Sequence, residues 1–271
     1  MSITAKNKAL EAFLGELGHL VVAYSGGVDS TLVAASAHRV LGDRAVAVTA
    51  VSPSIPAREV RAARSLAHAR GWRHLMVATH EVEREEYATN SPDRCYCCKT
   101  ELFEVLKPIA AEEGAAIAVG TTVDDLGDHR PGLTAVVEHD VVSPLVEAGI
   151  TKSEVRALSR VLGLPTADKP ASPCLASRFA YGVRVTPQGL RRIDRAEEML
   201  RGLGFEVLRV RDHGDIVRIE VRAEEVARAA ELRERIVEEL NALGWQYVTL
   251  DLAGFRSGSM NEVLAAPTIK S

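Results

Sequence analysis

The chain has 271 residues, 46% of them hydrophobic and 26% charged, with a formal net charge of −4 at pH 7. This size and apolar content suffice for a full α/β core and a second, smaller domain, while the acidic balance argues against nucleic acid as a partner, because binding to a phosphate backbone needs clustered Lys and Arg. Because the sequence has no long apolar run and no signal-peptide pattern, we expect a cytoplasmic protein without a membrane partner.

The first predicted strand, at 20–24, runs directly into the segment Ser-Gly-Gly-Val-Asp-Ser at 25–30, and a helical pattern continues from residue 28 to residue 41. Two adjacent glycines let the backbone turn sharply and approach an anion closely. The following helix directs its positive end at the same place. The sequence therefore predicts a strand, a phosphate-binding turn and a helix.

Each residue type in this turn suits a triphosphate with its metal ion. Gly26 and Gly27 let backbone N–H groups approach the phosphates. Ser25 and Ser30 add hydroxyl donors, and Asp29 supplies a hard oxygen for Mg²⁺. The motif lacks the lysine of a Walker A loop. It resembles instead the pyrophosphate loop of the N-type ATP pyrophosphatases, which cleave ATP between its α and β phosphates, and this implies ATP and Mg²⁺ as cofactors with Asp29 in a catalytic role.

Short apolar runs alternate with helical patterns as far as residue 170, which predicts a parallel twisted sheet with helices on both faces. Thr49, on the second strand, is a further candidate for nucleotide binding. Thr151 and Glu154 predict a capping box at the start of the last helix. The other strands are expected at 45–51, 74–78, 116–119 and near 141, and the other helices at 57–70, 98–113 and 152–162.

The pattern changes after residue 170. A linker rich in Pro, Ser and Ala is expected at 171–186, and it carries Cys174. A small α+β domain with an antiparallel sheet is expected at 187–271, where it would bind substrate or support oligomerisation. Its predicted elements are a helix at 187–203, strands at 205–210 and 216–221 around a turn at 213–215, a helix at 223–243 and a strand at 247–250.

Four cysteines in a chain expected in the cytoplasm favour metal binding or thiol chemistry over disulfides. Cys95 and Cys98 form a Cys-x-x-Cys pair at the start of a predicted helix, where the helix dipole stabilises thiolates. With Cys174 as a third ligand they could hold a [4Fe-4S] cluster or a zinc ion, each with one open position. The plain alternative is that the cysteines are small buried hydrophobic residues, and Cys97 has no assigned role.

Several separated motifs together resemble the LarE family, the ATP-dependent sulfur transferases that build the nickel-pincer nucleotide. In that family ATP adenylylates a carboxylate of pyridinium-3,5-biscarboxylic acid mononucleotide, and sulfur then displaces AMP to leave a thiocarboxylate. The likeness spans nearly the whole chain, and its motifs lie at 25–30, 93–99, 124–132, 168–170, 174–178 and 254–261.

The resemblance also assigns the thiols. Cys174, in the segment Pro-Cys-Leu-Ala-Ser-Arg, matches the family's sulfur-delivering cysteine. In one branch of the family this cysteine surrenders its own sulfur. In the other branch three cysteines hold a [4Fe-4S] cluster that passes on a sulfide, and Cys95, Cys98 and Cys174 resemble that branch.

A mononucleotide substrate needs a second phosphate site. Arg209 and Arg211 alternate on one predicted strand and therefore face the same side, where their planar guanidinium groups could bind phosphate or carboxylate. Arg178, Arg256 and Ser257 are further candidates.

Two other enzyme classes remain open at this stage, an amide-forming ligase similar to NAD synthetase and a tRNA thiolase. A non-catalytic nucleotide-sensing module is the third alternative. By family resemblance, the partners would be the small nucleotide substrate, an upstream carboxylase and a downstream nickel-inserting enzyme, and the chain would form a homo-oligomer, a hexamer.

Overall fold

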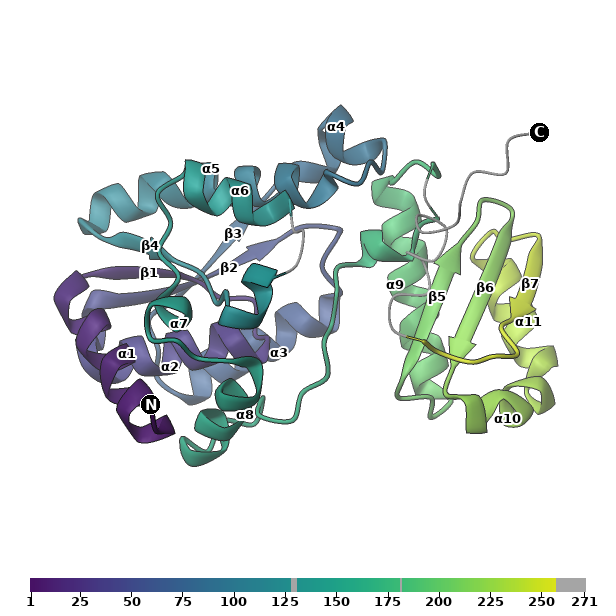
Figure 1. Ribbon diagram of the computed structural model, residues 1–271. Coiled ribbons are helices and arrows are strands. Elements are labelled where there is room, and N and C mark those ends of the chain that lie inside the picture. Colours follow the sequence, from purple (N-terminus) through teal and green to yellow (C-terminus); the bar gives the residue numbers. More distant parts are fainter. Residues whose placement is uncertain (128–130, 181, 257–271) are drawn as a thin grey trace. The chain divides into compact units, whose positions relative to one another are not determined.

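Figure 1 shows the computed structural model of the chain, which describes residues 1–127, 131–180 and 182–256. The chain divides into two compact units. The first combines Met1–Tyr87 with Pro92–Pro173, and the second combines Ala88–Ser91 with the described residues from Cys174 onward. In the described part of the chain, no helix is both long enough and apolar enough to span a membrane.

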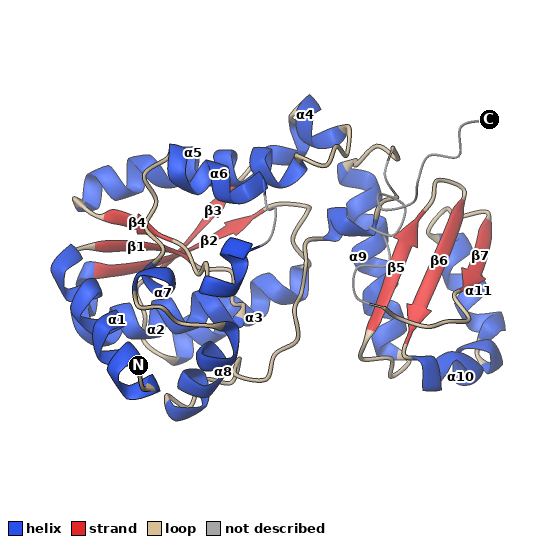
Figure 2. Cartoon of the chain, in the orientation of Figure 1, coloured by secondary structure: helices blue, strands red, loops and turns tan. Residues whose placement is uncertain are grey.

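A four-stranded parallel sheet forms the centre of the first unit (Figure 2). Its order is β3-β2-β1-β4, and the strands are β1 (Leu20–Ala23), β2 (Ala45–Val51), β3 (His74–Ala78) and β4 (Ala116–Ala118). The strand expected near residue 141 is reduced to a single bridge between Ala118 and Val142, because the chain follows the sheet edge for one residue pair there.

Alternate residues of the central strands face opposite helical layers, as the pleat of a strand requires. Leu20 and Val22 pack into one apolar cluster, whereas Val21 packs into the other. This arrangement confirms the predicted parallel sheet with helices on both faces. The first cluster includes residues of α1 (Ile3–Leu17), α2 (Val28–Leu41), α3 (Ala57–Ala69), α7 (Pro144–Glu147) and α8 (Lys152–Val161), and the second includes residues of α5 (Arg94–Glu113) and α6 (Pro131–Glu138).

The start of helix α8 was predicted correctly from the sequence, whereas the start of helix α5 was not. The capping box of α8 is confirmed, because Thr151 Oγ1 accepts from Glu154 N and the Glu154 carboxylate accepts from Thr151 N at 2.9 Å. Helix α5 was expected from Cys98 but begins at Arg94, so the whole cysteine segment is helical. Its N-cap residue makes no side-chain capping bond, which leaves no local signal for the true start.

A three-stranded sheet with order β5-β6-β7 forms the second unit (Figure 2). Strands β5 (Leu208–Asp212) and β6 (Ile216–Val221) pair antiparallel around the predicted turn. Strand β7 (Tyr247–Leu250) pairs parallel to β6, so the sheet is mixed rather than fully antiparallel. The parallel pairing is possible because helices form the crossover between the two strands.

The helices of the second unit are α9 (Pro187–Gly202), α10 (Val226–Glu231) and α11 (Arg233–Ala242). The single helix expected at 223–243 is thus interrupted at Leu232. The strand expected from Phe205 starts at Leu208, and Phe205 is instead fully buried, with the Arg228 guanidinium carbon 4.6 Å from its ring centroid. The remaining short helices are α4 (Glu85–Ala88), η1 (Gly42–Arg44), η2 (Glu81–Glu83), η3 (Val123–Gly127), η4 (Leu175–Arg178) and η5 (Ala223–Glu225).

Candidate functional site

The turn between β1 and α2 is built by close backbone packing. Gly26 has φ +69°, a left-handed conformation, and a Cβ added there would lie 2.8 Å from Ala63 Cβ on α3. Gly120, just past β4, packs equally closely, because an added Cβ would lie 2.7 Å from Ser30 N. Helix α3 and the segment after β4 therefore pack directly against this turn, and neither Gly26 nor Gly120 leaves room for a side chain.

Two serine hydroxyls fix the inside of the turn. Ser30 Oγ accepts from Ser25 N at 3.2 Å and lies 3.0 Å from Ser25 Oγ. Gly27 N donates to Ser25 Oγ at 3.3 Å. Gly27 is the N-cap of α2, so the first N–H groups of that helix, which have no partners within the helix, point toward the turn. The result is a rigid group of donors suited to an anion.

Asp29, in the first turn of α2, has one oxygen engaged and one unsatisfied. Oδ2 forms an ion pair with Lys152 Nζ. Oδ1 is buried and has no hydrogen-bond partner among the described residues. The two side chains are 24% and 44% exposed, and ion pairs this accessible to water contribute about 0–1 kcal/mol. The carboxylate therefore keeps acceptor capacity and is held by an easily broken contact.

Lys152 projects from a well-anchored helix start. It is the first residue of α8, and its backbone N donates to Asp124 Oδ2 at 2.5 Å. Lys6, on α1, pairs with Glu154 at 2.7 Å and so ties the same helix start to the first helix. The Asp124 carboxylate thus orders a helix start here.

A second lysine contacts the turn. Lys169 Nζ donates to Gly26 O at 2.8 Å and pairs with Glu59 at 2.6 Å. Partial burial alone would raise the pKa of Glu59, but the contacts with Lys169, Arg58 and Ser172 outweigh it and lower that pKa. The segment around Lys169 is thereby fixed against the turn by a charged pair.

The Thr49 side chain is committed to the sheet. Thr49 Oγ1 donates to Tyr24 O and lies 2.8 Å from His74 Nε2. Thr49 is buried, and burial also lowers the pKa of His74. Its role in nucleotide binding stays a prediction.

Cys95 and Cys98 lie one helical turn apart on α5 and therefore on one face. Cys95 is exposed and Cys98 half-buried, and none of the four cysteines forms a disulfide. Removal from water lowers the pKa of the neighbouring Lys99 ammonium, and the charge of Cys98 and Cys95 opposes that shift. Burial raises the pKa of Cys97, with a further contribution from Glu86, which makes it a poorer thiolate.

Cys174 belongs to the second unit, at the N-cap of η4. Its carbonyl accepts from Ser177 Oγ at 2.8 Å and from the Arg178 guanidinium at 3.0 Å. Arg178 is fully buried and pairs with Glu197 on α9 at 2.9 Å. A buried arginine therefore fixes the backbone at this cysteine.

Arg209 and Arg211 occupy alternate positions of β5 and share a face. Arg211 donates to Ser177 O at 3.1 Å and pairs with Glu220 at 2.8 Å. Burial and the neighbouring charge of Arg178 lower the pKa of Arg209 to about 10. Arg178, Arg209 and Arg211 therefore lie near one another beside the Cys174 segment, together with the carboxylates of Glu197 and Glu220.

Two further predicted site residues, Arg256 and Ser257, have little or no described structure around them that supports a role. Arg256 is exposed and lies 3.8 Å from Asp251, and Ser257 lies outside the described residues. In the described ranges, no group of three or more His, Cys, Asp or Glu side chains is placed to hold a metal ion. The predicted nucleotide residues and the Cys95–Cys98 pair belong to the first unit, and Cys174 with the arginines belongs to the second.

Three residues at the turn were not assigned from the sequence, namely Gly120, Lys152 and Lys169. Lys169 lies in a motif that was noticed at 168–170 but given no role. Lys152 meets Asp29 across 123 positions of sequence. Only the order of the strands brings such distant segments to one edge of the sheet, so no local pattern could have identified the contacts of Lys152 and Lys169 with the turn.

Comparison with known proteins gives full-length relatives, although no family model matches the chain. An uncharacterized protein of Synechocystis sp. is 46% identical over 97% of this chain and 99% of its own length. The pyridinium-3,5-bisthiocarboxylic acid mononucleotide synthase of Lactiplantibacillus plantarum is 40% identical over 97% of this chain and 96% of its own length. A tRNA-specific 2-thiouridylase of Azorhizobium caulinodans is 31% identical over 56% of this chain and 49% of its own length.

Proposed function

This chain belongs to the LarE family of pyridinium-3,5-bisthiocarboxylic acid mononucleotide synthases, and we propose that it uses ATP to replace a carboxylate oxygen of pyridinium-3,5-biscarboxylic acid mononucleotide with sulfur. The observation that carries the ATP-dependent part is the rigid donor group between β1 and α2, with the unsatisfied oxygen of Asp29 beside it. The tRNA-thiolase relative covers about half of the chain, so it supports the shared nucleotide chemistry rather than an RNA substrate.

The first step forms an acyl adenylate. A substrate carboxylate oxygen attacks the α-phosphorus of ATP, the bond from that phosphorus to the bridging oxygen breaks, and pyrophosphate leaves. Ser25, Ser30 and the first N–H groups of α2 bind the phosphates. Asp29 would hold Mg²⁺, because its buried Oδ1 lacks a partner in the described part and a carboxylate oxygen suits this ion. When bound, Mg²⁺ neutralises the charge that develops on pyrophosphate.

The second step replaces AMP by sulfur. A sulfur nucleophile attacks the carbonyl carbon of the adenylate, and AMP leaves with the electron pair of the broken carbon–oxygen bond. Cys95, Cys98 and Cys174 are outside disulfides and would hold a [4Fe-4S] cluster through three ligands. When bound, this cluster would supply a sulfide as the donor. Cys174 as a sacrificial donor of its own sulfur is the competing route.

The substrate's phosphate would bind at Arg209 and Arg211. Burial is the main cause of the low pKa of Arg209, and the charge of Arg178 adds to it, so an anion bound there would stabilise the charged guanidinium. Arg178 supports this site by fixing the Cys174 backbone rather than by reaching the phosphate. An upstream carboxylase and a downstream nickel-inserting enzyme fit a cytoplasmic synthesis of this kind, with the chain as a homo-oligomer.

The test uses protein purified without oxygen, assayed for iron and sulfide and then incubated with ATP and the dicarboxylate mononucleotide. We expect AMP, pyrophosphate and a product in which sulfur replaces oxygen, detected by mass spectrometry. Cys95→Ala and Cys174→Ala should lose iron and sulfur transfer, while Cys97→Ala serves as the matched control and should keep both. Sulfur transfer in a single turnover by an iron-free protein would contradict the cluster and favour the sacrificial cysteine.

A further inference from the structure

We infer that Lys152 changes its partner during the reaction: it neutralises Asp29 in the nucleotide-free protein and binds the pyrophosphate of ATP once Asp29 holds the metal ion. The inference rests on the proposed function and adds a residue to it. The starting contact is the ion pair between Lys152 Nζ and Asp29 Oδ2. The ammonium thus occupies one side of the carboxylate expected to bind the cation.

The geometry lets the Lys152 side chain change its partner without movement of the backbone. Helix α8 starts with a capping box and with the bond from Lys152 N to Asp124, so the backbone of Lys152 is fixed. The side chain is 44% exposed, and in the described part of the chain its ammonium bonds Asp29 alone. Helices α2 and α8 pack side by side (Figure 1), so a released ammonium stays within reach of the turn.

Lys169 provides the contrast that selects Lys152. Its ammonium is held by Gly26 O and by Glu59, and neither of these acceptors is expected to bind the metal ion. Cation binding therefore removes the counterion of Lys152 but leaves that of Lys169 in place. Once the metal ion occupies Asp29, the Lys152 ammonium lacks a counterion and is attracted to the phosphates of ATP beside it.

Binding to pyrophosphate would act in the transition state. As the bond between the α-phosphorus and the bridging oxygen breaks, negative charge grows on the departing pyrophosphate. Lys152 would donate a charge-assisted hydrogen bond to these oxygens, and this stabilises the transition state more than bound ATP. The lysine is not deprotonated, and the charge balance of the step is unchanged.

The experiment compares Lys152→Gln and Lys152→Arg with Lys107→Gln, a matched control at an exposed position of α5. The first measurement is pyrophosphate release with ATP and the dicarboxylate mononucleotide. We expect Lys152→Gln to lower kcat about 100-fold with little change in KM for ATP, Lys152→Arg to recover most of the rate, and the control to match the unmodified protein.

The second measurement is the Mg²⁺ concentration needed for half-maximal binding of a fluorescent, non-hydrolysable ATP analogue, with no substrate present. Without the competing ammonium, Lys152→Gln should need less Mg²⁺ than the unmodified protein, although it reacts more slowly. A merely structural role would weaken binding and rate together and lower the melting temperature, and this outcome would overturn the inference.

Unchanged pyrophosphate release and unchanged Mg²⁺ dependence in Lys152→Gln would also overturn it. Failure of the proposed function looks different. In that case the unmodified protein releases no pyrophosphate with the dicarboxylate mononucleotide, while the Mg²⁺ titration of the two proteins still reports whether Lys152 competes for Asp29.

Discussion

The two units present positive charge in different ways. In the first unit the candidate anion site is built mainly from backbone N–H groups and small side chains around Gly26, and the packing there excludes even a Cβ atom. In the second unit the charge comes from arginines, of which Arg178 and Arg211 are buried and paired with carboxylates. The site in the first unit depends on close approach of backbone N–H groups to an anion, whereas the second unit depends on the balance between buried arginines and carboxylates.

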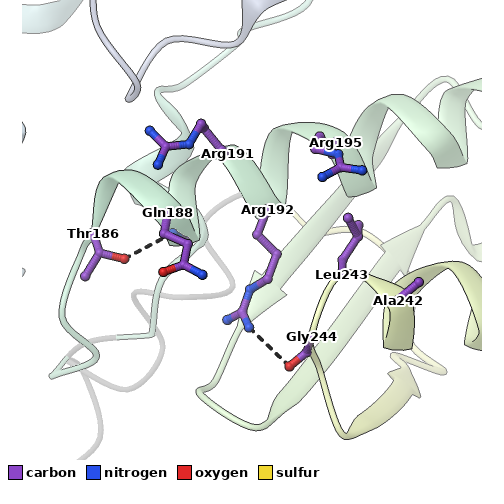
Figure 3. Close-up of a pocket in the computed structure, with 9 residues that line it drawn as sticks. Thr186, Gln188, Arg191, Arg192, Arg195, Ala242, Leu243 and Gly244 are labelled. Carbon is purple, nitrogen blue, oxygen red and sulfur yellow. Dashed lines mark hydrogen bonds between the residues drawn. The ribbon is translucent and has the colours of Figure 1, made fainter.

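The second unit also carries arginine outside this pairing. A hollow of about 490 Å³ lies beside α9 and is lined in part by Arg191, Arg192 and Arg195. Figure 3 shows these side chains on the helix. Arg192 is held by Asp212 at 2.5 Å and lies 4.2 Å from the centroid of the Trp245 ring. Arg192 therefore acts both as a charged partner of Asp212 and as a packing residue against Trp245.

The largest effect that this comparison predicts is at Arg178. Arg178→Met should destabilise the second unit by about 3–5 kcal/mol, because it removes the 2.9 Å partner of the buried Glu197 carboxylate and leaves the longer contact with Arg201 at 3.6 Å. The double variant Arg178→Met/Glu197→Met should recover much of that loss, since both buried charges are then removed. Denaturant titration of the three proteins measures this, and equal instability of the single and double variants would contradict the charge-balance account.

The matching change in the first unit adds a single methyl group. Gly120→Ala should cost about 1–3 kcal/mol and weaken ATP binding, because the new Cβ would press on Ser30 N and Asp29. Gly202→Ala is the control, since an added Cβ there meets no atom within 4 Å among the described residues. Thermal unfolding and binding of a fluorescent ATP analogue measure the two effects. Normal binding by Gly120→Ala would show that the turn tolerates expansion.

The backbone-built site was the more predictable of the two from sequence. Adjacent glycines after an apolar run report a local conformation, and the positive φ of Gly26 agrees with it. The capping box of α8 is predictable for the same reason. The relation of Lys152 to Asp29 is not local, because strand order decides it, and one sequence without an alignment carries no direct record of strand order.

The second unit was harder to predict for a related reason. Arg178 and Glu197 are ordinary surface residue types by composition, and only the packed fold shows that they are buried together. The parallel pairing of β7 depends on a crossover through α10 and α11, which short strand patterns do not encode. Burial of charge and strand direction are properties of the assembled unit.

The smallest predicted effect is a pH dependence that differs between the units. Burial lowers the pKa of His38 and His74 in the first unit and of His213 in the second. The charge of Arg64 lowers the pKa of His74 further, and the charge of Arg218 does the same at His213. The charge of Asp43 opposes the shift at His38. When the pKa of a histidine is lower in the folded state than in the unfolded chain, where it is near 6.5, the unfolded chain binds the proton first as the pH falls. The contribution of that histidine to stability is therefore complete above about pH 6.5 and is lost as the pH falls through its folded-state pKa.

Thermal unfolding followed from about pH 7.5 down to about pH 5 should therefore show a loss of stability below about pH 6.5. One histidine changes the free energy of unfolding by at most about 1.4 kcal/mol per pH unit. His38→Gln should reduce the slope of the first unit, where the ring stacks on Trp72 at 5.4 Å, and His213→Gln should reduce only that of the second. Because the first unit holds two of the three groups, its transition should shift more with pH, and equal shifts in the two units would contradict this difference between them.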